Sequence, residues 1–192
     1  SRGLGDVYKR QTGVSPGARR YHAQPFLRQS SSVMSEQSIE ERAQRFLAVL
    51  RHCQVLGMSV ESADSKGLTL RLPYAPHIVG NPDTGVIHGG AITTLMDTTC
   101  GISTVCVLPE FEICPTLDLR IDYMHPALPG KDVFGFAECY RVTPNIIFTR
   151  GYAYQDDPEQ PIAHVVGAFM RMGKAVQGGA ELKRNIRQGG GA

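Results

Sequence analysis

No stretch of the 192-residue sequence is apolar enough to span a bilayer. A membrane-spanning helix needs about 20 consecutive apolar residues, and the longest candidate, Ala91–Leu108, is interrupted by Asp97 and by several Thr, Ser and Gly residues. The sequence also lacks a C-x-x-C pair among its five cysteines. An odd number of irregularly spaced cysteines argues against a disulfide framework or a zinc site, and it predicts reduced thiols in a cytoplasmic protein.

The net charge is only +2, and it is unevenly distributed. Residues 1–33 contain six basic residues and one acidic residue, so the remaining residues carry a net charge of −3. A mildly acidic folded region argues against a nucleic-acid-binding surface. The composition, 42% hydrophobic and 20% charged, is typical of one globular domain with a single core.

Residues 1–33 lack hydrophobic periodicity and are rich in Gly, Arg, Ser and Gln. The string GDVYKRQ at Gly5–Gln11 resembles the translation of a transposon-end adapter used in sequencing libraries, and Tyr21–Ser32 is similar to a transit peptide. We favour a disordered or artefactual leader over 1–33, with Met34 as the natural start. We expect residues 34–173 to form the domain and the polar, Gly-rich residues 174–192 to be a flexible tail.

Two segments have the periodicity of helices. Ser38-Ile39-Glu40-Glu41 reads as a capping box, and the apolar residues that follow it predict a helix over about Ile39–His52. A second helix is predicted from about Gly89 to Val107, ended by Pro109. Its apolar stripe consists of Ile92, Leu95, Met96, Thr99, Ile102 and Cys106.

The remaining periodic segments read as strands. Gly57–Glu61 and Leu68–Leu72 flank the turn-like Asp64–Gly67 and predict a hairpin, whereas Pro73–Gly85 is predicted to be a loop. Four strand segments with short links follow: Thr116–Met124, Asp132–Val142, Ile146–Gln155 and Ile162–Met172. Short links predict antiparallel neighbours. The order of elements therefore predicts an α+β domain, in which a curved antiparallel sheet embraces one long helix.

Residues 81–97 read NPDTGVIHGGAITTLMD and carry the pattern G-x-x-H-G-G followed by an acid. Its members are Gly85, His88, Gly89, Gly90 and Asp97, and the string Asp122-Tyr123-Met124-His125-Pro126 follows downstream. With these motifs the chain resembles the hot-dog thioesterases of the phenylacetate-pathway and 4-hydroxybenzoyl-CoA type, over roughly Ser38–Met172. The resemblance implies a hot-dog fold and hydrolysis of an acyl-CoA to a free acid and CoA, with no metal or cofactor.

The resemblance assigns the central roles to Asp97 and Gly89. Asp97 is expected to activate water or to attack the thioester carbonyl, and the Gly89 N–H is expected to stabilise the oxyanion. The residues support this, because the first N–H groups of a helix lack intrahelical partners and glycine lets a ligand approach the backbone. The alternative for Asp97 is a carboxylate held by neighbouring threonine hydroxyls, or a solvated one.

Four further positions or groups are expected at the site. Asn81 is expected to polarise the carbonyl or hold water, with a simple Asn-Pro turn as the alternative. Thr116 is expected to position water or the carboxylate, with ordinary β-propensity as its alternative. His88 is expected to bond the loop and line the pocket rather than act as a base. Further substrate contacts are expected from Gly90, Met124, His125 and Pro126. The loop Pro73–Gly85 and the first helix are expected to shape the acyl pocket.

The spacing along the second helix predicts a site shared between subunits. Gly90 and Asp97 are seven residues apart, which places them about 10 Å apart along the axis. One chain therefore cannot bring Asp97 and the helix end to one carbonyl, whereas an antiparallel helix from a second subunit can. The helix face that would permit close approach is small and polar: Gly90, Thr94, Asp97, Thr98 and Gly101. We expect a homodimer, able to pair into a homotetramer, that binds acyl-CoA and neither nucleic acid nor membrane.

Two other functions stay open at this level. A hot-dog dehydratase or hydratase would act on a β-hydroxyacyl thioester, but it needs a His and a carboxylate in a different arrangement. A non-catalytic acyl-CoA-binding domain is the other alternative, and Asp97 counts against it.

Overall fold

The computed structural model describes residues 36–173, so the predictions for the leader (1–33) and the tail (174–192) lie outside the described residues. The helical elements are α2 (Glu36–Ala48), α3 (Arg51–Val55), η1 (Pro76–Ile78), α4 (Gly89–Ser103) and η2 (Thr104–Cys106). The strands are β1 (Ser59–Ala63), β2 (Leu68–Leu72), β3 (Val79–Asn81), β4 (Val86–Ile87), β5 (Thr116–Tyr123), β6 (Val133–Val142), β7 (Ile146–Tyr154) and β8 (Ala163–Met170).

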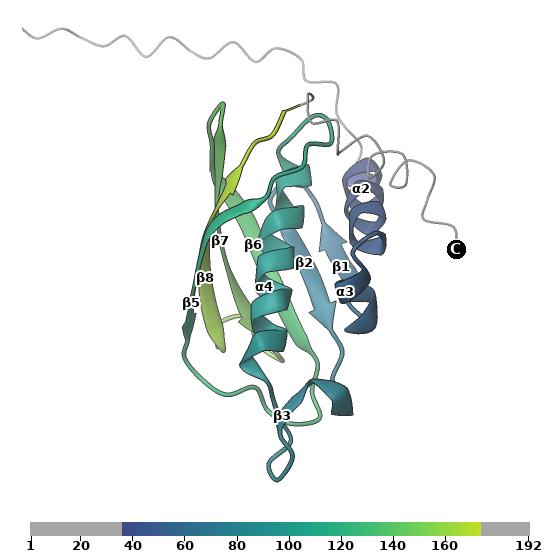
Figure 1. Ribbon diagram of the computed structural model, residues 1–192, viewed down its shortest axis with the longest axis vertical. Coiled ribbons are helices and arrows are strands. Elements are labelled where there is room, and N and C mark those ends of the chain that lie inside the picture. The colour runs from purple at the N-terminus through teal and green to yellow at the C-terminus, as the bar shows by residue number, and fades with distance from the viewer. Residues whose placement is uncertain (1–35, 174–192) are drawn as a thin grey trace, which may run out of the picture. The chain divides into compact units, whose positions relative to one another are not determined.

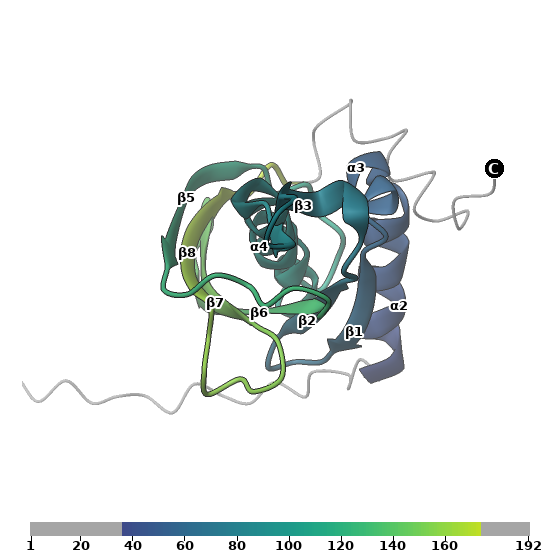
Figure 2. The same cartoon turned by 90° about the horizontal axis from the view of Figure 1, so that it is seen from below.

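Six strands form one antiparallel sheet in the order β1-β2-β6-β7-β8-β5, and α4 packs against one face of it. Figures 1 and 2 show the sheet curving around α4, with α2 and α3 beside the β1 edge. This is the predicted hot-dog arrangement, and the predicted fold class is confirmed. Within residues 36–173, no helix has both the length and the apolar character that crossing a membrane requires.

The core forms between α4 and the sheet. The second predicted helix ends at Ser103, and its last turn is the 3-10 helix η2. The residues predicted for its apolar stripe are buried, except Cys106 in η2, which is half-buried. Gly135 on β6 lies beneath this stripe, where a Cβ atom would come within 3.0 Å of Leu95 and Met96. The sheet approaches α4 this closely because residue 135 has no side chain.

The first predicted helix is wrong in its boundaries. Ser38 lies inside α2 instead of capping it, and the helix stops at Ala48 before α3 begins at Arg51. Leu50 between them has an extended backbone, with φ −88° and ψ 92°, although neither Pro nor Gly interrupts the segment. The break turns α3 so that Cys53 and Leu56 are buried against the core. Tertiary packing overrides the local helical preference.

The short links predicted that consecutive strands are neighbours in the sheet, and this prediction is wrong for β5 and β6. Short links correctly predict the pairing of β6 with β7 and of β7 with β8. β5, however, pairs with β8 at the far edge, and β6 pairs with β2 instead. The link 124–132 can span about 30 Å when extended, which exceeds the roughly 14 Å between the two strand positions. Its length therefore does not force β5 and β6 together.

The predicted β1–β2 hairpin is present, whereas the predicted loop Pro73–Gly85 contains regular structure. The β1–β2 hairpin is confirmed, and Asp64 Oδ1 accepts hydrogen bonds from the Lys66 and Gly67 N–H groups at 2.7 and 3.1 Å. The region Pro73–Gly85, predicted to be a loop, contains η1 and the strand β3, which pairs with β4 in a separate short ribbon. The ribbon leads directly into α4.

Candidate active site

Asp97 and Thr116, both predicted site residues, are in direct contact. Asp97 projects from the middle of α4 and is half-buried, and Thr116 is the first residue of β5. Thr116 Oγ1 donates a hydrogen bond to Asp97 Oδ1 over 2.8 Å. Thr116 is paired with Phe169 of β8, and the Met170 N–H donates to the Pro115 carbonyl at 2.9 Å. The end of β8 therefore fixes the start of β5 beside α4.

A cavity of about 530 Å³ opens beside this pair. Its polar lining includes Thr94, Asp97, Thr98 and Thr116. Its apolar lining includes Phe46, Val49, Leu50, Ile102, Ile113 and Phe169. Asp97 is the single carboxylate among the lining residues that the structure describes, so a buried apolar ligand there would contact one ionisable acid. Phe46 of α2 and the residues of the helix break, Val49 and Leu50, form part of the wall, whereas the loop Pro73–Gly85 does not line this cavity. That the first helix and this loop shape the acyl pocket stays a prediction.

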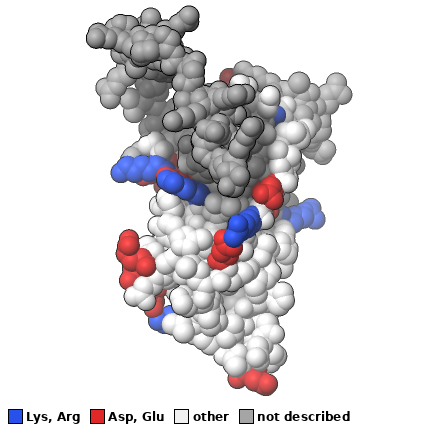
Figure 3. Space-filling view, turned by 90° about the vertical axis from the view of Figure 1, so that its left-hand side faces the viewer, with Lys and Arg blue, Asp and Glu red and all other residues white. Residues whose placement is uncertain are grey.

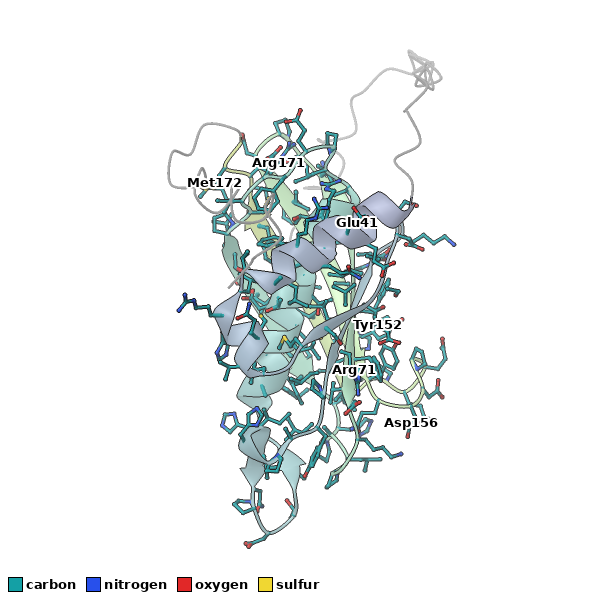
Figure 4. All side chains as sticks on the ribbon, turned by 90° about the vertical axis from the view of Figure 1, so that its right-hand side faces the viewer. Glu41, Arg71, Tyr152, Asp156, Arg171 and Met172 are labelled. Carbon is teal, nitrogen blue, oxygen red and sulfur yellow. The ribbon has the colours of Figure 1, made fainter. Side chains whose placement is uncertain are left out.

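An ion pair anchors the segment that leads into Thr116. Arg171 contacts Glu112 through two hydrogen bonds, Nε to Oε2 at 3.1 Å and Nη2 to Oε1 at 2.5 Å. A third bond joins Arg171 Nη1 to the Thr143 carbonyl at 3.1 Å. The hydrogen bond with Glu112 raises the pKa of Arg171, and both side chains are largely buried. Figure 4 shows Arg171 at the opposite end of the sheet from Asp156.

The N-terminus of α4 is capped by His88. His88 Nδ1 accepts the Gly90 N–H at 2.9 Å, and the His88 carbonyl accepts the Ala91 N–H at 2.9 Å. Because Nδ1 accepts this bond, the neutral imidazole carries its proton on Nε2. The Gly89 N–H donates to none of the residues that the structure describes, and Gly89 is exposed. An unpaired, exposed N–H at a helix start can stabilise negative charge.

The Gly89 carbonyl is held from β5. The Tyr123 hydroxyl donates to it at 2.7 Å, and Thr93 Oγ1 donates to it at 3.0 Å. Sequence reasoning noted Tyr123 only as part of the downstream motif and did not single out Thr93. No periodicity reveals the contact between Tyr123 and the Gly89 carbonyl, because the two residues lie 34 positions apart in the sequence.

The predicted site residues fall into separate cavities within one chain. Asp97 and Thr116 line the cavity described above, whereas His88 and Gly90 line a second one of about 390 Å³ at the start of α4. His52 and Thr94 line both, so the two cavities adjoin along α4. Gly89 and Asp97 are eight residues apart in α4, about 12 Å along its axis.

The downstream motif lies elsewhere. Met124, His125 and Pro126 line a third cavity, of about 700 Å³, beside the β7–β8 loop. Three carboxylates line it as well: Asp156, Asp157 and Glu159. These charges disfavour a phosphate group there. Contact between the motif and a substrate therefore stays a prediction.

Asn81 also lies apart from Asp97. Its side-chain Oδ1 accepts the Asp83 N–H at 3.0 Å, and its carbonyl accepts the Gly85 N–H at 2.8 Å. The residue thus forms its own turn before β4. Its expected role in polarising a carbonyl stays a prediction.

The thiols near the site are poor nucleophiles. Cys53 lines the cavity, with Sγ 3.5 Å from Thr98 Oγ1, and burial raises its pKa. Burial also raises the pKa of Cys100, on the same helix, to about 12. Thiolate is the reactive form of cysteine, so the ionisable acid in the cavity wall, Asp97, is the better candidate for chemistry.

Figure 3 shows the face that carries the free edge of the sheet. Charged side chains of both signs form a few separate groups, and much of the described surface between them is uncharged. The strands β5 and β8 carry four large apolar side chains that are exposed: Leu117, Tyr123, Val166 and Met170.

This chain is similar to several known proteins. The family model of the thioesterase superfamily matches residues 84–162, which contain Gly89, Asp97 and Thr116. A crystal structure of a Pseudomonas aeruginosa protein is 83% identical and covers 70% of this chain and 99% of that one, with a TM-score of 0.66. A medium/long-chain acyl-CoA thioesterase, YigI of Escherichia coli K12, is 28% identical over 112 residues, 50% of this chain and 71% of that protein.

A "putative esterase" of Halobacterium salinarum is 37% identical over 75 residues, which are 38% of this chain. The match spans half the length of that relative. The family match and the fold confirm the resemblance drawn from the sequence. The chain belongs to the thioesterase superfamily, a hot-dog-fold family of thioester hydrolases.

Proposed function

We propose that this protein hydrolyses an acyl-CoA thioester to a free acid and CoA, with Asp97 as the reacting carboxylate. The observation that carries this proposal is the position of Asp97. It lies in the wall of an apolar cavity, and a hydroxyl from another element, Thr116, donates to one of its oxygens. An acyl chain in this cavity would bring its carbonyl carbon close to the carboxylate.

The reaction follows from these groups. Asp97 takes a proton from water as the water oxygen attacks the carbonyl carbon. The electron pair of the C=O bond moves to oxygen, and the Gly89 N–H of a helix start stabilises the resulting oxyanion. Collapse of this intermediate breaks the C–S bond, and the CoA thiolate receives the proton. Direct attack by Asp97 would instead form a mixed anhydride, which water then hydrolyses.

We propose that the complete site combines two subunits, with Gly89 from one and Asp97 from the other. Three features support this. About 12 Å of helix separates the two groups within a chain. The Gly89 N–H is exposed and unpaired among the described residues. The edge strand β5 is largely exposed, including its apolar residues Leu117 and Tyr123. An antiparallel second copy along α4 and β5 would cover these groups and supply the missing partner.

The acyl group is proposed to be of medium or long chain length. A cavity of about 530 Å³ lies within the usual range of small-molecule sites, and its apolar lining suits a hydrocarbon chain. The name of the Escherichia coli relative points the same way. An acetyl group would leave most of this apolar surface without contact.

A thiol-release assay over short, medium, long and aromatic acyl-CoAs tests the proposal. We expect CoA release, fastest with medium or long chains, and a kcat lowered on the order of 10²-fold or more in Asp97→Asn. KM should change little, because the CoA portion binds elsewhere. Glu61→Gln, at an exposed carboxylate on β1 at the opposite edge of the sheet, is the matched control.

Two added measurements, of acyl-CoA binding and of enoyl-CoA or β-hydroxyacyl-CoA consumption, separate the alternatives. Binding of acyl-CoA without thiol release would indicate a non-catalytic binding domain. Consumption of an enoyl-CoA or β-hydroxyacyl-CoA without thiol release would indicate a hydratase or dehydratase. Either result contradicts the proposed hydrolysis.

A further inference from the structure

Three oxygens form a closed cluster at the start of α4. The Tyr123 hydroxyl lies 2.7 Å from the Gly89 carbonyl oxygen, and Thr93 Oγ1 lies 3.0 Å from the same oxygen. The two hydroxyls are themselves 2.7 Å apart. Three contacts thus share two hydroxyl protons, and each side chain restrains the other. The cluster ties the end of β5 to the first turn of α4.

The cluster matters because an oxyanion donor must be held in a fixed direction before the reaction begins. Glycine is the residue least able to hold its own backbone, since it has no side chain. A Cβ atom at Gly89 would meet nothing closer than the Tyr123 hydroxyl, at 3.5 Å. Packing within the chain therefore does not immobilise this residue. Hydrogen bonds must do so.

Both peptide units that flank Gly89 are anchored. The unit before it is held through the His88 carbonyl, which accepts the Ala91 N–H. The unit after it is held at its N–H by His88 Nδ1 and at its carbonyl by Tyr123 and Thr93. Only the Gly89 N–H lacks an acceptor among the described residues.

We propose that Tyr123, together with Thr93, is a positioning residue for the reaction. The two hydroxyls fix the peptide between Gly89 and Gly90, and the His88 carbonyl holds the preceding peptide, which carries the Gly89 N–H. With both units held, the backbone cannot rotate at Gly89, and its N–H stays aimed at the thioester carbonyl oxygen. This inference rests on the proposed function of Gly89. It goes beyond it by assigning to β5 the task of ordering the oxyanion donor.

A purely structural role for the Tyr123 hydroxyl is less consistent with its surroundings. Within a single chain Tyr123 is 50% exposed and contributes little to the core. Its backbone is already tied to β8 through the pairing with Ala163. Removal of the hydroxyl should therefore loosen the backbone at the start of α4 while leaving the stability of the sheet almost unchanged.

The test compares Tyr123→Phe with Tyr140→Phe. Tyr140 is 52% exposed and also lies on a strand, so it is a matched control without a hydrogen bond to α4. We expect Tyr123→Phe to lower kcat about tenfold with little change in KM or melting temperature, since it removes an interaction that acts in the transition state. Tyr140→Phe should match the wild type.

Variants of Thr93 provide a second test. Thr93→Val should also lower kcat, and Thr93→Ser, which keeps the hydroxyl, should restore most of it. The double variant Tyr123→Phe/Thr93→Val should lose less than the product of the two single losses, because the two hydroxyls share one cluster. Fully multiplicative losses would contradict a shared positioning role.

Amide hydrogen exchange gives a readout that does not depend on turnover. The Gly90 N–H belongs to the peptide that the cluster holds, so its exchange should accelerate in Tyr123→Phe and stay unchanged in Tyr140→Phe. Unchanged kcat and unchanged exchange in Tyr123→Phe would overturn the inference while Asp97→Asn still tests the proposed function. A wild-type protein that hydrolyses no acyl-CoA would instead overturn the proposed function, and the positioning role with it.

Discussion

Thr116 Oγ1 donates a 2.8 Å hydrogen bond to Asp97 Oδ1 and so joins the start of β5 to the middle of α4. The bond restrains the carboxylate in one orientation. The second oxygen, Oδ2, accepts a hydrogen bond from none of the residues that the structure describes. That oxygen is the one available to take a proton from water or to attack a carbonyl carbon.

Loss of the Thr116 hydroxyl should therefore impair the reaction while leaving the carboxylate present. We expect Thr116→Val to lower kcat roughly tenfold or more, the scale of one hydrogen bond to a charged group. Thr116→Ser keeps the donor and should retain most of the activity. Steady-state thiol release measures both variants. Equal activities for the Val and Ser variants would show that the hydroxyl has no part in catalysis.

Mixed dimers should reveal whether the site is shared. Asp97→Asn removes the carboxylate, and Gly89→Val blocks the approach to the helix N–H without a clash closer than 3.5 Å at its Cβ. Each variant alone should be nearly inactive. When the two are co-assembled, one of the two sites in each heterodimer has neither lesion, so activity should partly return. Heterodimers that form without any activity would place both groups within one chain.

Gly101 should control the length of acyl chain that is accepted. It lies on the small face of α4 and lines the cavity, where a Cβ would meet Phe169 at an ordinary 3.5 Å. Gly101→Ala should thus keep the wild-type preference, whereas Gly101→Leu should fill the cavity and lower kcat/KM for long chains more than for short ones.

Sedimentation of Gly101→Leu also tests close helix approach, since the bulky residue should weaken the dimer. A fully active monomer would contradict the shared site.

Asp132 should contribute stability that is lost in acid. The Tyr74 N–H donates to it at 2.8 Å and Arg71 Nε at 2.7 Å, and these contacts, the backbone bond first, lower its pKa. Because the folded-state pKa lies below the unfolded one, the contribution is present at neutral pH and disappears as the pH falls through the folded pKa.

Asp132→Asn should therefore lower the free energy of unfolding by about 1–2 kcal/mol at pH 7. The difference from the wild type should shrink towards zero in strong acid. Urea denaturation at several pH values measures this, with Asp118→Asn as the control. A difference that stays constant down to acid pH would exclude the ionised carboxylate as its source.

The thiols should resist alkylation in the folded protein. Burial raises the pKa of all five, to about 12 for Cys100 and Cys106 and to about 11 for Cys114. A raised pKa keeps these groups protonated at pH 8, and only thiolate reacts quickly. Mass spectrometry after iodoacetamide treatment should show slow labelling that becomes fast in guanidinium. Rapid labelling of Cys100 in the folded state would contradict this.

The sequence by itself determined most of the secondary structure and the fold class. The apolar residues of α4 recur with a helical period, which predicts a helix with one buried face, and these residues are buried in the structure. The turn residues between β6, β7 and β8 leave too few residues for any arrangement but antiparallel pairing. The motif that contains Gly89 and Asp97 identified the family, because those residues are close together in the sequence.

Only the tertiary structure decided which distant residues meet. The break at Leu50 and the crossing of β5 to the far edge of the sheet depend on where apolar surface can be buried, which no local pattern records. The edge strand β5 runs alongside α4. Its first residue, Thr116, therefore contacts Asp97 in the middle of the helix, and its last residue, Tyr123, contacts Gly89 at the helix start. Sequence spacing fixes distances along one helix, but contacts between elements are set by packing.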